Sequence, residues 1–103
     1  MATSFASTPS PPSPPRFAHG RIVMTASVRD LIRETRLDVL TCLHRHLHGD
    51  WGDLPDEDRR SNETALRTGD RLFSSYDAMP SVKLWIITEA DRSITTLLLP
   101  DDY

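Results

Sequence analysis

Three histidines alternate with other residues near the middle of the chain, at His44, His46 and His48. On a helix, His44 and His48 lie one turn apart at one edge of an apolar stripe, and His46 lies at the other edge. A histidine pair at this spacing can bind zinc, and a metalloprotease helix carries glutamate directly after the first histidine. Arg45 stands there instead, and the sequence offers no evident third ligand. We therefore expect no bound metal and no cofactor.

Glu89 and Arg92 flank a short polar connector towards the end of the chain. Together with His44 they would supply a base, an acid and a phosphate clamp, the groups needed for metal-independent cleavage of RNA through the 2′-hydroxyl. Opposite charges beside a tight turn also pair for purely structural reasons. A catalytic set of His44, Glu89 and Arg92 is therefore the alternative interpretation, and the leading one assigns no catalytic residue.

Acidic residues are dense over 50–58 and recur at 101–102. Asp50 and Asp53 belong to a turn in which two glycines bracket Trp51, a pattern that predicts a tryptophan folded back onto the core. An acidic surface can dock on a nucleic-acid-binding protein by standing in for phosphates. Asp50 and Asp53 are therefore candidate partner-binding residues.

The stretch 83–100 predicts the hairpin around which the other elements are arranged. Two runs rich in β-branched and aromatic residues flank the connector at 90–93. Alternation gives one aliphatic face that helices should cover, made of Leu84, Ile86, Leu97 and Leu99. The opposite face carries Trp85, Ile87, Glu89 and Leu98. Because large apolar patches seldom stay exposed, we predict that this face binds a partner, with Trp85 central and Glu89 at its rim.

The preceding residues predict a strand near 20–25, a short helix capped by Ser27, and helices at about 37–48 and 53–67. A strand is expected at 71–76, followed by a loop. Leucines at spacings of three and four should share the buried face of the second helix: Leu37, Leu40, Leu43 and Leu47. The fold class is therefore α+β, with two or three helices on one face of a three- to four-stranded antiparallel sheet.

The length of 103 residues suits one domain, which we place at residues 20–103. Residues 1–19 are expected to form a disordered tail, because the run of prolines at 9–15 lacks amide donors for a helix or sheet. The same run has the PxxP spacing that SH3-type grooves bind, which is an alternative to a merely flexible tail.

Charge and composition exclude some function classes. The net charge of -3 counts against direct nucleic-acid binding, which requires clustered Lys and Arg. The single Cys42 fits a reducing cytoplasm, and no apolar run approaches the length of a membrane span. We therefore expect a cytoplasmic protein without a membrane partner.

Three motifs resemble those of a group of small bacterial proteins from plasmids and other mobile elements: Gly-Asp-Trp-Gly-Asp at 49–53, the stretch 85–93 and Leu-Pro-Asp-Asp-Tyr at 99–103. Proteins of this group are labelled plasmid-related protein or restriction-enzyme subunit. The resemblance covers residues 20–103, implies a bacterial cytoplasmic setting, and carries no catalytic residues with it.

Small acidic proteins in that setting are often inhibitors of restriction or CRISPR systems. We therefore expect a non-enzymatic interaction protein that binds a host or defence-system protein, or a second copy of itself. The order of helices and strands is also similar to that of small RNases of the barnase and RelE type. That second resemblance implies the alternative function, a metal-independent RNase toxin.

Overall fold

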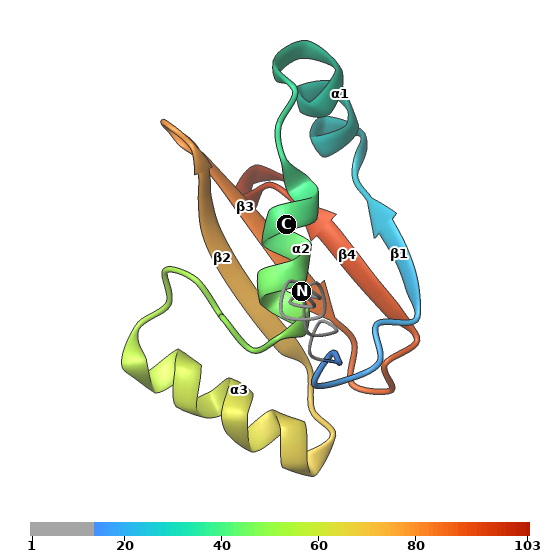
Figure 1. Ribbon diagram of the computed structural model, residues 1–103, viewed down its shortest axis with the longest axis vertical. Helices are drawn as coiled ribbons and strands as arrows, with labels where there is room; N and C mark the ends of the chain where they lie inside the picture. The colour runs from blue at the N-terminus through green and yellow to red at the C-terminus, as the bar shows by residue number, and fades with distance from the viewer. Residues whose placement is uncertain (1–13) are drawn as a thin grey trace, which may run out of the picture.

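A mixed four-stranded sheet lies at the centre of the computed structural model, which describes residues 14–103 (Figure 1). In chain order the elements are β1 (Arg21–Met24), α1 (Ala26–Thr35), α2 (Val39–Leu47), α3 (Asp56–Thr68), β2 (Leu72–Met79), β3 (Val82–Thr88), β4 (Ile94–Leu98) and a 3-10 turn (Pro100–Asp102). The strand order across the sheet is β1-β4-β3-β2. The α+β class predicted from the sequence is confirmed, with three helices preceding the last three strands.

The sheet is mixed, so the prediction of a purely antiparallel sheet is wrong. Strands β2, β3 and β4 are antiparallel neighbours, whereas β1 pairs with β4 in parallel. The predicted hairpin at 83–100 is confirmed, with Trp85 opposite Leu98 and Ile86 opposite Leu97. A four-residue strand separated from its partner by three helices can enter in either direction, and its composition does not distinguish the two.

Strand β2 runs on to Met79 and returns directly into β3 at Val82. The loop predicted over this region is therefore a tight hairpin turn with Ser81 in a left-handed conformation. Pro80 lies in the turn itself, where its missing amide donor interrupts no ladder bond.

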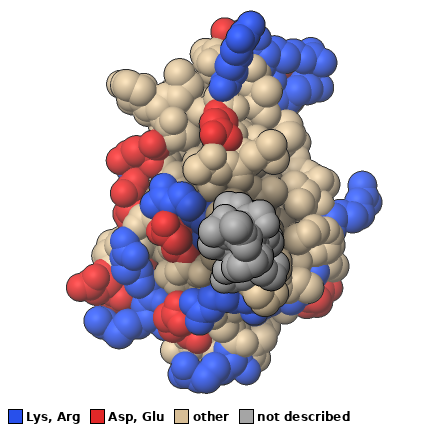
Figure 2. All heavy atoms as spheres, viewed as in Figure 1, with Lys and Arg blue, Asp and Glu red and all other residues tan. Residues whose placement is uncertain are grey.

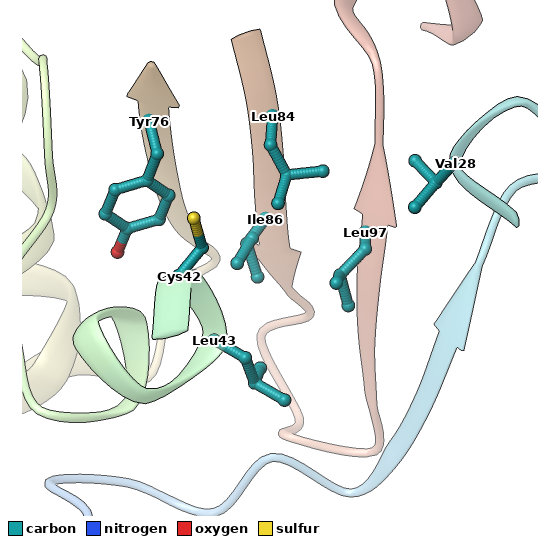
Figure 3. Close-up of a cluster of buried hydrophobic side chains, with 7 residues drawn as sticks. All are labelled: Val28, Cys42, Leu43, Tyr76, Leu84, Ile86 and Leu97. Atoms are coloured by element: carbon teal, nitrogen blue, oxygen red, sulfur yellow. The ribbon is translucent and has the colours of Figure 1, made fainter. Parts of the chain in front are cut away.

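The helices cover one face of the sheet. Helix α2 crosses that face, α1 lies beyond one end of it, and α3 flanks the lower part of β2 (Figure 1). The main core joins α1 and α2 to the central strands (Figure 3): Val28, Cys42, Leu43, Tyr76, Leu84, Ile86 and Leu97. A second cluster beneath α3 contains Trp51, Leu54, Ala65 and Leu72, so the predicted inward turn of Trp51 is confirmed.

Helix α2 is rotated relative to the predicted leucine stripe. Leu40 is 73% exposed, while Cys42, Leu43 and His46 point into the protein. The helix begins at Val39, with Asp38 as its N-cap, so Leu37 is buried outside it. His46, which the sequence places at an edge of the leucine stripe, therefore lies on the buried face of the helix.

A chain of buried hydrogen bonds runs through His46. Its Nδ1 lies 2.5 Å from Oγ of Ser74, and its Nε2 lies 2.9 Å from Oγ1 of Thr88. Oγ1 of Thr88 also lies 2.7 Å from Oγ1 of Thr95. The Thr95 hydroxyl in turn donates to the backbone carbonyl of His19 at 2.8 Å. The chain therefore ties α2 to all three antiparallel strands and to the segment before β1.

The hydrogen-bonding capacity of each group gives this chain a direction. Thr95 uses its only proton on His19, so Thr88 must donate to Thr95 and accept from Nε2–H of His46. Nδ1 then accepts from the hydroxyl of Ser74. The network thus assigns a neutral His46 protonated on Nε2. Burial first, and then the charge of Arg92, lowers the pKa of His46 from 6.5 to about 3.

The packed part of the chain begins before residue 20, which corrects the predicted boundary. The Arg16 guanidinium forms two hydrogen bonds to Glu63 of α3, at 3.0 and 2.8 Å. The Phe17 ring packs edge-on against His46 and stacks on Trp51, with centroid distances of 5.2 and 6.2 Å. Residues 1–13, where most of the predicted tail falls, lie outside the described residues.

We predict that Phe17→Ala lowers the free energy of unfolding by about 2 kcal/mol, because the ring is half-buried between His46 and Trp51. Leu40→Ala is the control and should stay within about 0.5 kcal/mol of the wild type, since its side chain is exposed. Urea unfolding measures both. Equal stabilities of the two variants would place Phe17 outside the fold.

The lowered pKa of His46 predicts that the protein loses stability in mild acid. The unfolded chain takes up a proton below about pH 6.5, whereas the folded chain does so only near pH 3. The free energy of unfolding should therefore fall by about 1 kcal/mol between pH 7.5 and 5.5. His46→Gln should remove this part of the pH dependence, and His44→Gln, at an exposed position, should retain it. Urea unfolding at the two pH values tests this, and an unchanged slope in His46→Gln would contradict the assignment.

Candidate protein-binding groove

A groove of about 240 Å³ opens on the sheet face opposite α2. Its lining is largely aromatic: Arg71, Phe73, Trp85, Ile87 and Tyr103. Strand alternation explains this set, because Leu72, Ser74 and Tyr76 point to the helices while Phe73 points away from them. On β3, Leu84 and Ile86 likewise point inward, and Trp85 and Ile87 point outward.

Three rings form the walls of the groove in edge-to-face contacts. Phe73 and Trp85 have centroids 5.1 Å apart with an interplanar angle of 87°, and Trp85 and Tyr103 are 5.9 Å apart at 70°. Such geometry is the one that ring quadrupoles favour. Ile87 lies directly across from Phe73 in the ladder and is only 5% exposed, so it forms the floor.

One cation stands at the rim of the groove. Arg71 lies 3.7 Å from Glu89, donates to the Tyr103 hydroxyl at 3.2 Å and sits over the Tyr103 ring. Both charged side chains of the pair are about half exposed. An ion pair of this exposure contributes at most about 1 kcal/mol, so Arg71 can exchange Glu89 for a ligand at little cost.

Tyr103 is held over the groove by the residue before it. The Asp102 carboxylate accepts hydrogen bonds from the hydroxyls of Thr25 and Ser27, both at 2.7 Å, and from the Leu99 amide at 2.9 Å. The Leu99 amide, and then the two hydroxyls, hold the pKa of Asp102 below its usual value. This Asp102 clamp joins the end of the sheet to the start of α1 and leaves the Tyr103 side chain 72% exposed.

The structure brings together only part of the predicted partner-binding set. Trp85 and Ile87 line the groove and Glu89 stands at its rim. Leu98 shares this face opposite Trp85 but is 6% exposed, so little of it is available to a partner. Asp50 and Asp53 lie elsewhere, along the outer edge of β2.

The turn holding Asp50 and Asp53 protects the edge of β2. Asp53 donates its amide to the Ser75 carbonyl at 2.7 Å and accepts from the Asp77 amide at 3.0 Å. Asp50 forms an ion pair with Arg45 at 2.7 Å. Further along the edge, the Asn62 side chain exchanges two hydrogen bonds with the backbone of Phe73. Both acids therefore hold the turn in place, away from the groove.

The structure does not assemble the alternative catalytic set. His44 is exposed on α2, on the helix side of the sheet, and its ring lies tilted against that of His48, with the centroids 4.1 Å apart. Glu89 pairs with Arg71 on the opposite side. Arg92 donates to the backbone carbonyls of Ala65 and Asp70 at 3.1 and 2.6 Å, where it caps the end of α3.

Other surfaces carry less specific chemistry. A hollow of about 410 Å³ beside α3 has only polar lining residues, and one of about 300 Å³ lies between the β2–β3 turn and Pro100. On the helix-covered face, acidic and basic side chains are interspersed over α3 (Figure 2). The apolar side chains of Ile22, Met24 and Leu40 are exposed elsewhere on the protein.

Within residues 14–103, no group of three or more His, Cys, Asp or Glu side chains is arranged to hold a metal ion. None of the helices in the same residues has the length and apolar character needed to cross a bilayer. Comparison of the chain with models of protein families, with curated proteins and with solved structures finds no match. The resemblances to mobile-element proteins and to small RNases therefore stay predictions.

We predict that Asp102→Ala releases Tyr103 from Trp85, because the carboxylate accepts all three hydrogen bonds of the clamp. The tryptophan emission should shift to longer wavelength as the Trp85 indole gains water contact. Asp101→Ala is the matched control, one residue earlier on the same turn. Identical spectra for the two variants would contradict the role of the clamp.

Proposed function

We propose that the chain is a small non-enzymatic interaction protein that binds a partner protein through the groove at Trp85. The observation that carries this proposal is the grouping of three edge-to-face rings around a buried isoleucine, with Arg71 at the rim. Aromatic residues and arginine are the types most enriched where protein interfaces carry their binding energy.

The shape of the groove supports a protein ligand. Its floor and two of its walls belong to adjacent strands and are therefore fixed by the sheet. The third wall, Tyr103, is exposed and can adjust to a ligand. A rigid aromatic pocket with one adaptable polar edge can accept an anchoring side chain of a partner at little entropic cost.

The resemblance to mobile-element proteins favours a particular partner class. We propose that the partner is a component of a host defence system, of the restriction or CRISPR type, which the protein inhibits by binding. The acidic net charge of -3 supports binding to a nucleic-acid-processing protein rather than to the nucleic acid. Self-association through the same groove is the competing outcome.

Trp85→Ala should weaken partner binding by about thirtyfold, since a buried aromatic anchor typically contributes about 2 kcal/mol. The test expresses the wild type, Trp85→Ala and Leu40→Ala in bacteria with an active restriction or CRISPR system. The wild type and Leu40→Ala should raise the efficiency of plasmid transformation and capture a component of that system, whereas Trp85→Ala should do neither. Circular dichroism establishes that the variants are folded.

Two results would contradict the proposal. One is equal activity of the wild type and of a folded Trp85→Ala variant. The other is a wild type that captures no defence component, leaves transformation unchanged and is a dimer by light scattering. In the second case the groove, or another surface, would serve self-association.

A further inference from the structure

The two edges of the sheet differ in how they are covered. The turn at Asp53 and the side chain of Asn62 form hydrogen bonds to the edge of β2. The edge of β1, at the other side of the sheet, has no neighbouring element among residues 14–103 (Figure 1). An uncovered strand edge is a template for pairing with another chain, so the β1 edge is a candidate interaction surface.

The hydrogen bonds between β1 and β4 show which backbone groups of β1 face outward. The amides of Arg21 and Thr25 donate to carbonyls of β4 and of the turn before it, at 2.9 and 3.0 Å. Because backbone groups alternate in direction along a strand, the amides and carbonyls of Ile22 and Met24 point away from β4. No described residue bonds to them. Two donors and two acceptors are thus left on this edge.

One pairing of two copies satisfies all of these groups. In an antiparallel ladder, the two residues of a hydrogen-bonded pair exchange both backbone bonds. If Val23 of each copy lies on a two-fold axis, Ile22 of either copy is opposite Met24 of the other. Each of these two pairs then contributes two hydrogen bonds. A pairing centred on Ile22 or on Met24 would instead form only one such pair and would leave the remaining groups without partners.

The apolar side chains of β1 fit the same pairing. Met24 lies beside Leu97 of the main core, so Met24 and, by alternation, Ile22 point to the helix-covered face. Each of the two residues is nevertheless 42% exposed. A two-fold axis perpendicular to the sheet keeps this face on the same side in both copies. The side chains from the two copies then lie next to one another and cover one another.

Complementary charges lie on the opposite face. Arg21 is exposed and forms no ion pair with a described residue. In the pairing centred on Val23, Arg21 lies opposite Thr25 of the second copy, with the Cα atoms about 4.5 Å apart. The Thr25 hydroxyl donates to the Asp102 carboxylate at 2.7 Å. The guanidinium of each copy is therefore placed beside the Asp102 carboxylate of the other, where a charge-assisted hydrogen bond can form.

We propose that two copies of the chain associate through their β1 edges, with Val23 on the two-fold axis and Arg21 of each copy paired with Asp102 of the other. The two sheets then join into one, whose outer edges are the covered β2 strands. The proposal goes beyond the proposed function, because β4 separates this interface from the groove at Trp85. The dimer therefore presents two grooves.

The shared edge is short, so the association should be weak and reversible. Interfaces that bury less than about 1,200 Å² typically belong to transient complexes, and we expect a Kd of about 10 μM. Sedimentation velocity of the full chain between about 1 and about 500 μM should therefore show monomer passing into dimer. A wild type that stays monomeric over this whole range would overturn the proposal.

An added cysteine tests the register. Val23→Cys places two thiols at the axis with Cα atoms about 4.5 Å apart, within the range that a disulfide spans. Ile22→Cys is the matched control, because its Cα atoms would lie about 8–9 Å apart, beyond that range. The native Cys42 is buried, and the wild type measures its contribution. Oxidised glutathione should convert Val23→Cys, but not Ile22→Cys or the wild type, into a covalent dimer on a non-reducing gel. Equal cross-linking of the two variants, or of Ile22→Cys alone, would overturn the proposal.

Charge reversal tests the predicted ion pair. Arg21→Asp should weaken dimerisation by about tenfold or more, because it replaces two attractive contacts by two repulsive ones. Arg60→Asp makes the same charge change on α3, beside the opposite edge of the sheet, and should leave the Kd within about twofold of the wild type. Circular dichroism establishes that both variants are folded. Equal weakening by the two substitutions would contradict the assigned pairing of Arg21.

Trp85→Ala separates this interface from self-association through the groove. A folded Trp85→Ala variant should dimerise with the Kd of the wild type, since Trp85 lies on β3 and is not part of the β1 edge. If Trp85→Ala is monomeric while Arg21→Asp is still a dimer, self-association belongs to the groove and the β1 interface is wrong. If Trp85→Ala dimerises normally but captures the defence component as well as the wild type does, the proposed function fails and the β1 interface stands.

Discussion

The hydrogen-bond chain from Ser74 through His46 to the His19 carbonyl is the interaction on which the rest of the structure depends. An unpaired buried polar group costs about 1–3 kcal/mol, and the rotation of α2 and the strand register of this fold pair every member of the chain. Strand alternation then fixes what points outward, including Trp85. The groove on one face is therefore a consequence of the polar chain on the other.

Two surface contacts attach the ends of the described chain to this framework. At one end, Arg16 pairs with Glu63 of α3 and Phe17 packs against His46. At the other end, Asp102 accepts a hydrogen bond from Thr25 at the start of α1. Both use exposed or half-buried groups, which open at lower free energy than core contacts. The strands thus supply the fixed walls of the groove, and Tyr103 supplies the wall that a ligand can move.

The sequence predicted what depends on local pattern. Alternation in the hairpin placed Trp85 and Ile87 on the face that carries the groove, and the glycine-bracketed turn placed Trp51 in the core. It could not predict what depends on long-range pairing. Alternation along β2 is enough to place Phe73 on the outward face. Its pairing with Ile87, however, depends on how β2 and β3 align in the folded protein. Likewise, hydrophobicity favoured Leu40 as buried over His46, because the hydrogen-bond partners of His46 come from two strands that are distant in the sequence.

The central claim is that the ligand binds the outer sheet face rather than the exposed apolar side chains of Ile22, Met24 and Leu40. Hydroxyl-radical footprinting of the free protein and of its complex with the captured partner tests this most directly, because methionine, leucine and aromatic side chains all react. The account predicts protection of Phe73, Trp85 and Tyr103 in the complex, with Met24 and Leu40 unchanged. Protection of Met24 and Leu40 with unaltered labelling of the three rings would contradict it.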